Sequence, residues 1–163
     1  MLEKIVSGGQ TGVDRAALDA AMDLGIDVGG WCPKGRLAVD GTIPAKYPLT
    51  ETPDESYRTR TQWNVRDSDA TLIVFADDLT GGTALTIEFC GQLGRPYEVH
   101  QLKSGGAAWA GGSGSDPMEI LYWLKSYPIK VLNVAGPREE KFSPIYDRAY
   151  KLLHKLFQLT QKS

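Results

Sequence analysis

The sequence predicts a doubly wound α/β domain with about five parallel strands and helices on both faces of the sheet. Apolar strand-like segments alternate with helix-like segments, and two of the strand-to-helix turns are rich in glycine. The segment Ala70–Phe75 is also apolar nearly throughout, as in a strand buried on both faces. Because strand–helix–strand connections are right-handed crossovers, we expect a parallel sheet. No linker divides the chain, so we expect a single domain over residues 1–163.

The first strand, turn and helix are built around the segment Ser7–Arg15. Residues 3–7 predict a short strand, and from Val13 apolar side chains recur on one helical face as far as Gly25, which suits a C-terminal cap. Glycines in the turn let a ligand approach the backbone, and free N–H groups at a helix start favour an anion. The turn suggests a phosphate or oxyanion site, but a turn that merely joins strand to helix would share its glycines.

An irregular segment follows a second short strand, which we expect around residues 26–31. Residues 33–52 show little periodicity, and the Asp-Gly pair within residues 38–43 predicts a small hairpin or turn. Long loops in compact domains are often functional. This one carries Lys34 and Arg36, which either bind an anionic ligand or are solvated surface cations.

The next helix has an unusual polar face. Thr52, Pro53 and Glu55 match a helix start, with a cap, a proline at the first helical position and a glutamate after it, and we expect the helix to run to about Arg66. A surface helix normally shows an apolar stripe. Here one face is polar, so it either lines a ligand site or faces solvent; its residues are Tyr57, Arg60, Thr61 and Asn64.

A second glycine turn follows the buried strand Ala70–Phe75. It spans Asp77–Thr83 and leads into a helix that Gly94 caps. Two such turns at the carboxyl ends of parallel strands would meet at the crevice where these folds bind ligands.

The remaining segments complete the alternation. They are a strand at Tyr97–Leu102, a loop rich in glycine and serine at Lys103–Ser115 with Trp109 as its large residue, a helix capped by Asp116, a strand at Lys130–Ala135 and a final helix from Ser143. Gly136-Pro137-Arg138 follows the last strand, so we expect it at the same edge as the glycine turns.

Composition excludes several classes of function. The net charge of −2 and the pI of about 5.7 argue against nucleic acid and membrane surfaces as partners. No apolar run matches a membrane span, and the N-terminus has no signal-peptide pattern. Cys32, Cys90, His100 and His154 are isolated from one another, so we expect no zinc site. We therefore expect a cytoplasmic protein with reduced thiols.

Several segments, spread from the first strand to the start of the last helix, carry a family resemblance. They are Ser7–Ala21, Gly30–Arg36, Tyr47–Leu49, Glu51–Pro53, Arg60-Thr61, Asn64-Val65, Asp67–Ala70, Leu79–Thr83 and Asn133–Arg138. Together they resemble the molybdenum carrier, or molybdenum cofactor carrier, family. That family lies in the Rossmann-like superfamily that includes the Lonely Guy phosphoribohydrolases and the DNA-processing protein A family.

The resemblance implies a Rossmann-like domain that forms a homo-oligomer, a dimer or a tetramer, and binds the molybdenum cofactor or a related oxyanion. Such a ligand is anionic, so a carrier needs N–H donors and cations rather than catalytic groups. The sequence leaves open whether the ligand is the cofactor, molybdate or a nucleotide. We assign no catalytic or metal-ligating residue; the candidate binding residues are Gly8, Gly9, Gln10, Thr11, Gly12, Arg15, Lys34, Arg36, Arg60, Asn64, Gly81, Gly82, Thr83, Gly136 and Arg138.

Two alternatives compete with a carrier. The segment Thr80–Glu88 resembles the Pro-Gly-Gly-x-Gly-Thr-x-x-Glu motif of the Lonely Guy phosphoribohydrolases, with Glu88 on its carboxylate. There a carboxylate assists cleavage of the N-glycosidic bond of a nucleoside monophosphate. Ala84 and Leu85 replace the motif's Gly-Thr, which favours an exposed helix carboxylate instead. The other alternative is a nucleotide-sensing module.

Overall fold

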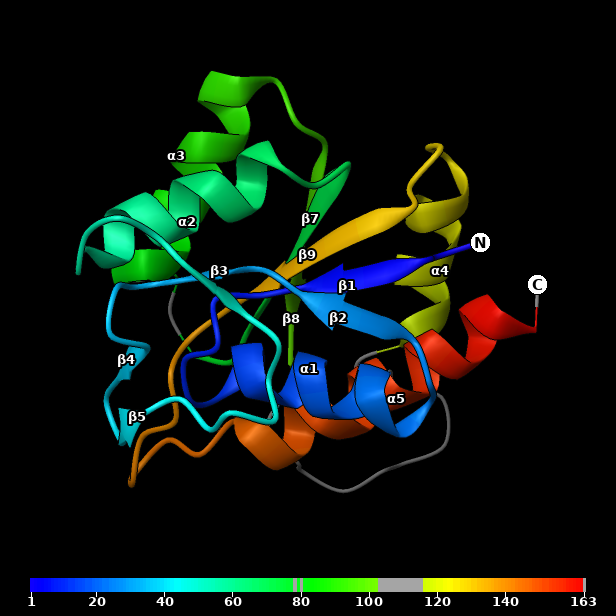
Figure 1. Cartoon of the computed structure of the whole chain (residues 1–163). Helices are drawn as coiled ribbons and strands as arrows, with labels where there is room; N and C mark the ends of the chain where they lie inside the picture. The colour runs from blue at the N-terminus through cyan, green and yellow to red at the C-terminus, as the bar shows by residue number, and fades with distance from the viewer. Residues whose placement is uncertain (78, 80, 103–115, 163) are drawn as a thin grey trace.

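A parallel sheet forms the centre of the molecule (Figure 1). The computed structural model describes residues 1–77, 79, 81–102 and 116–162, and within these ranges the main sheet has five strands in the order β2-β1-β9-β7-β8. All of its strand pairs are parallel, which confirms the predicted architecture. The strands are β1 (Lys4–Val6), β2 (Asp27–Gly29), β7 (Ala70–Phe75), β8 (Tyr97–Gln101) and β9 (Val131–Ala135).

Helices cover both faces of this sheet, as the sequence predicts (Figure 1). On one face α1 (Val13–Asp23), α4 (Pro117–Lys125) and α5 (Tyr146–Gln161) pack on apolar residues of the sheet. On the other face α2 (Tyr57–Arg66) and α3 (Gly81–Leu93) pack together through Val65, Phe89 and Cys90. None of the helices in the described ranges is long and apolar enough to cross a lipid bilayer.

The irregular segment between β2 and α2 contains two small pairings. Strands β3 (Trp31–Cys32) and β6 (Thr50–Glu51) pair in parallel. Strands β4 (Leu37–Ala38) and β5 (Gly41–Thr42) form the antiparallel hairpin that the Asp-Gly pair predicts. The predicted loop at residues 103–115, with Trp109, lies outside the described residues.

The predicted start of α2 at Thr52 is wrong. The helix begins at Tyr57, and the cap is Ser56, whose hydroxyl accepts a hydrogen bond from the Arg58 amide at 3.1 Å. Thr52 instead continues the pairing of β6 with β3, since its amide donates to the Cys32 carbonyl at 2.8 Å. A tertiary contact therefore removes this residue from the helix.

The final helix also starts later than the sequence predicts. It begins at Tyr146 rather than Ser143. The carboxylate of Glu139 accepts hydrogen bonds from the amides of Ile145 and Tyr146, the latter at 3.2 Å, and so satisfies the helix start. Ser143 is engaged elsewhere, because its hydroxyl donates to Asp77 at 2.6 Å.

Candidate functional site

A cavity of about 660 Å³ lies at the carboxyl ends of β1, β9 and β7. The chain passes from β1 to β2 on one side of β1, and on the other side β9 lies between β1 and β7, so the strand order reverses at this point. Open α/β sheets bind ligands at such points. All four residues of the polar face of α2 line it, which favours a ligand-site role for that face. The predicted site residues that line the cavity are Gly8, Gln10, Arg60, Asn64, Gly81, Gly82, Thr83, Gly136 and Arg138.

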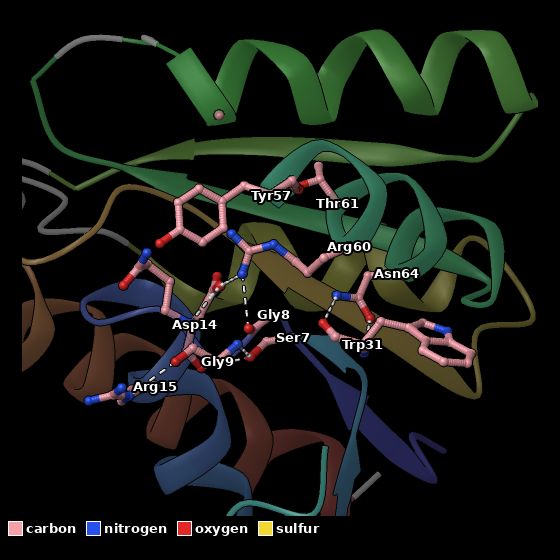
Figure 2. Close-up of polar contacts among 12 residues, drawn as sticks. Ser7, Gly8, Gly9, Asp14, Arg15, Trp31, Tyr57, Arg60, Thr61 and Asn64 are labelled. Atoms are coloured by element: carbon pink, nitrogen blue, oxygen red, sulfur yellow. Dashed lines mark hydrogen bonds and ion pairs between the residues drawn. The ribbon is translucent and has the colours of Figure 1, made fainter. Parts of the chain in front are cut away.

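Arg60 brings a positive charge into this cavity. Figure 2 shows its side chain extending from α2 toward Gly8 and Asp14, with the ring of Tyr57 beside it. Its Nη1 donates to the Gly8 carbonyl at 2.9 Å and lies 3.5 Å from the Asp14 carboxylate. The side chain is 12% exposed, and its buried Nε has no hydrogen-bond partner among the described residues. The guanidinium therefore keeps donor capacity and positive charge beside the cavity.

Asp14 is a buried acid at the start of α1 that also lines the cavity. Its Oδ2 accepts a hydrogen bond from the Gln10 amide at 3.2 Å. Burial raises the pKa of Asp14 to about 6, and it outweighs the opposing effects of Arg60 and of the Gln10 and Gly8 amides. A carboxylate of the protein itself thus occupies the first glycine turn.

The amides of that turn are largely satisfied within the turn itself. The Gly9 amide donates to the Ser7 hydroxyl at 3.3 Å, and the Thr11 amide donates to the Gln10 side chain at 3.0 Å. From the sequence, we expect these amides to bind a ligand anion. In the structure they bind the chain's own oxygens, because the side chains of Ser7 and Gln10 in the same turn lie within hydrogen-bond distance.

Gly9 and Gly12 of the first turn, together with Gly136 after β9, serve close packing. A Cβ at Gly12 would lie 2.4 Å from the Pro137 carbonyl oxygen, and φ there is +86°. At Gly9, where φ is +77°, a Cβ would lie 2.5 Å from Leu49 Cδ1. At Gly136 a Cβ would lie 2.1 Å from the Val74 carbonyl oxygen. These glycines let the strand ends and loops meet below the cavity.

At the second glycine turn, Gly82 has open space around it within the described part of the chain. A Cβ at Gly82 would have no heavy atom within 4 Å in the described part of the chain, and Gly82 lines the cavity at the start of α3. The first amides of a helix have no partner inside it, and they attract an anion. Thr83 lies beside them and is buried. The start of α3 and Arg60 are therefore the two features of the cavity best suited to a negative group.

Several predicted site residues lie outside the cavity lining. Gly9, Thr11 and Gly12 pack behind the first turn, as their contacts above describe. Arg15 is turned away from the cavity, and its guanidinium donates to the Gly9 carbonyl at 3.1 Å and pairs with the Asp40 carboxylate at 2.8 Å. The Asp40 carboxylate thus neutralises the positive charge that Arg15 would otherwise offer a ligand.

The two cations of the irregular segment have different surroundings. The guanidinium of Arg36 binds the carbonyl groups of four residues in its own loop: Ile43, Pro44, Tyr47 and Leu49. Arg36 therefore holds the loop together, away from the cavity lining. Lys34 is exposed, and its amide donates to the Asp54 carbonyl at 2.8 Å.

Glu88, the carboxylate of the enzymatic alternative, is exposed on α3 and is no part of the cavity lining. It accepts a hydrogen bond from Gln92 one helical turn later, at 3.1 Å.

Some residues of the cavity are absent from the sequence candidates. Asn133, 3% exposed, donates through Nδ2 to the Thr71 hydroxyl at 3.2 Å. An asparagine inside an apolar strand is the sequence signal that could have identified it. Further polar lining residues outside the sequence candidates are Asp14, Asp77, Thr86, Glu140 and Ser143. Among the described residues, no three His, Cys, Asp or Glu side chains are grouped as a metal site requires.

Comparisons with known proteins agree with this architecture. The model of the circularly permutated YpsA SLOG family matches residues 5–157. A crystal structure from Syntrophus aciditrophicus SB, described as a "putative molybdenum carrier protein", is 42% identical, with a TM-score of 0.82 over 96% of this chain and 94% of that one. A search of curated proteins gave no match. Both matches support a ligand-binding role for a Rossmann-like domain, and the chain belongs to the circularly permutated YpsA SLOG family.

Proposed function

We propose that the protein binds and carries a small anionic ligand, either the molybdenum cofactor or a related phosphate or oxyanion compound. The crystal structure described as a "putative molybdenum carrier protein", 42% identical to this chain, supports a ligand that contains molybdenum. The cavity of about 660 Å³ lies within the range of small-molecule sites. We include in this proposal the cytoplasmic location and the homo-oligomeric state expected from the sequence.

The observation that carries the proposal is the state of Arg60. A guanidinium that is only 12% exposed needs hydrogen-bond acceptors and a compensating charge. Gly8 supplies one carbonyl, and Asp14 lies at 3.5 Å, while Nε lacks a partner among the residues described. A phosphate or molybdate oxygen in the cavity would complete this environment with charge-assisted hydrogen bonds.

The start of α3 supplies the second part of the site. An anion at a helix N-terminus gains about 1 kcal/mol from the helix dipole, and about 2 kcal/mol where it is partly buried. Gly82 has no side chain to hold the anion away from these amides, and the described residues leave the space around it open. Micromolar affinity requires about 8 kcal/mol, so the helix start and the arginine would supply part of it and other contacts in the cavity the rest.

Other cavity residues fit binding better than catalysis. The Asp77 carboxylate accepts the Ser143 hydroxyl, and the Glu140 carboxylate pairs with Arg138 at 2.8 Å. Both acids therefore have partners inside the protein. With Glu88 also outside the lining, the carrier is favoured over the phosphoribohydrolase.

Native mass spectrometry of freshly purified protein tests the proposal, since it reports the bound ligand and the oligomer together. We expect a bound anionic small molecule that is lost in Arg60→Met and kept in Arg66→Met. Arg66 is a matched control on the same helix, half exposed and paired with Asp67. Equal ligand retention by both variants would contradict the proposal. Incubation with AMP, followed by measurement of free base, tests the enzymatic alternative.

A further inference from the structure

Asp14 holds the position that a bound anion would take in the first glycine turn. Its carboxylate accepts the Gln10 amide at 3.2 Å and lies 3.5 Å from Arg60 Nη1. The residue is 6% exposed and lines the same cavity as Arg60 and Gly82. The positive charge of Arg60 is therefore balanced by a negative charge of the protein itself.

A ligand anion at Arg60 would place a second negative charge close to this carboxylate. Two like charges in a buried site disfavour one another, and the usual relief is protonation of the carboxylate. Burial already raises the pKa of Asp14 to about 6, near neutrality, before any ligand is present. A protonated Asp14 would also release Arg60 from its internal partner.

The other charged groups around Asp14 have partners of their own. Arg15, the next residue of α1, pairs with Asp40 at 2.8 Å. On the loop after β9, Arg138 pairs with Glu140 at 2.8 Å. At the end of β7, Asp77 accepts the Ser143 hydroxyl at 2.6 Å.

From α2, Arg60 and the phenol of Tyr57 line the cavity beside Asp14. Asp14 differs from the other two acids of the cavity, Asp77 and Glu140, in being buried and in contact with Arg60. It is therefore the acid best placed to respond to a ligand at that arginine.

We propose that Asp14 takes up a proton when an anion binds at Arg60, so that the protein holds its ligand more tightly at mildly acidic pH than at alkaline pH. The inference rests on the proposed function, because it needs an anion at Arg60. Asp14 acts as a positioning residue that sets the charge state of the site. A carrier with this property would release an anionic ligand as the pH rises.

The test measures AMP affinity by calorimetry from about pH 5 to about pH 8 in the wild type and in Asp14→Asn. Asparagine keeps an oxygen for the Gln10 amide but carries no charge. We expect equal affinities near pH 5 and a tenfold to hundredfold advantage of Asp14→Asn near pH 8, since each pH unit above the pKa changes a coupled affinity by up to about tenfold. The ratio of the two dissociation constants cancels the titration of the phosphate itself.

Asp40→Asn is the matched control, because Asp40 pairs with Arg15 outside the cavity. It should follow the wild-type pH profile. If Asp14→Asn does not fold, net proton uptake by the wild type at about pH 7, measured in two buffers of different ionisation enthalpy, tests the same point. A constant affinity ratio across the pH range, or no net uptake, would overturn the inference. Failure of AMP and of molybdate to bind at every pH would instead count against the proposed function.

Discussion

Asn64 holds both sides of the Trp31 backbone. Its Oδ1 accepts the Trp31 amide at 2.7 Å, and its Nδ2 donates to the Trp31 carbonyl at 2.9 Å (Figure 2). This pair of hydrogen bonds ties α2 to β3. Because Arg60 lies one turn before Asn64 on the same helix, the contact also fixes where the guanidinium enters the cavity.

Replacing Asn64 with alanine should destabilise the protein by about 2 kcal/mol, because it removes the partner of two part-buried backbone groups of Trp31. Urea denaturation measures the change. Thr61→Val is a suitable control on the same helix, since the Thr61 hydroxyl donates to the Tyr57 carbonyl of its own helix. A stability of Asn64→Ala equal to that of the control would show that the contact to Trp31 contributes little.

Asp14 should make stability depend on pH in an unusual direction for an acid. Its pKa is raised from 3.8 to about 6 in the fold, so between these values the folded state binds more protons than the unfolded state. The unfolding free energy is therefore free of a penalty from Asp14 below about pH 4. It decreases as the pH rises toward and past about 6, and it stays lower at higher pH. The penalty at neutral pH amounts to up to about 3 kcal/mol.

Asp14→Asn should accordingly be more stable than the wild type near pH 8 and equal to it near pH 4, as measured by denaturant titration at the two pH values. Asparagine removes the buried charge and keeps the acceptor for Gln10. A variant less stable than the wild type at both pH values would mean that the ion pair with Arg60 outweighs the burial penalty.

Gly136 and Gly91 should respond oppositely to alanine. A Cβ at Gly136 would lie 2.1 Å from the Val74 carbonyl oxygen, so Gly136→Ala must displace backbone and should cost several kcal/mol. Gly91, within α3, has open space around its Cβ position in the described part of the chain. Gly91→Ala should therefore be neutral or stabilising by up to about 1 kcal/mol. Thermal unfolding of the two variants compares them directly, and similar melting temperatures would refute the distinction.

Arg36→Lys should weaken the irregular segment without changing ligand affinity. The guanidinium binds carbonyl oxygens of four residues, and a lysine ammonium has a single point of contact and cannot span them. We expect a loss of about 2 kcal/mol in unfolding free energy, with AMP affinity as in the wild type. A large loss of AMP affinity at an unchanged unfolding free energy would show instead that Arg36 belongs to the binding site.

The sheet and its helices could be predicted because their signals are local and repeated. The apolar run of β7 and the apolar stripe of α5 each bury a face that their own residues define. The residues at which helices begin could be predicted less well. The same cap and proline pattern is correct at Asp116 and wrong at Thr52, because Thr52 pairs with β3, a contact that no local pattern contains.

In the candidate site, too, features that follow from a local pattern could be predicted and those that depend on tertiary contacts could not. The polar face of α2 is visible in the sequence because polar residues recur at helical spacing, and the structure brings that face to the cavity. The sequence does not show that amides of the first glycine turn are already hydrogen-bonded within the protein, because this depends on where the Ser7 and Asp14 side chains lie. The partner of Arg15 is equally hidden, since Asp40 lies 25 positions away on the hairpin turn.

The most direct measurement compares the affinity of Gly82→Val and Gly91→Val for AMP and for molybdate by calorimetry. Both glycines lie in α3 with open space at their Cβ positions within the described residues, so both variants should fold, but Gly82 alone of the two lines the cavity. We predict that Gly82→Val loses binding by at least about tenfold, which corresponds to about 1.4 kcal/mol, while Gly91→Val binds as the wild type does. Equal affinities in the two folded variants would contradict an anion site at the start of α3.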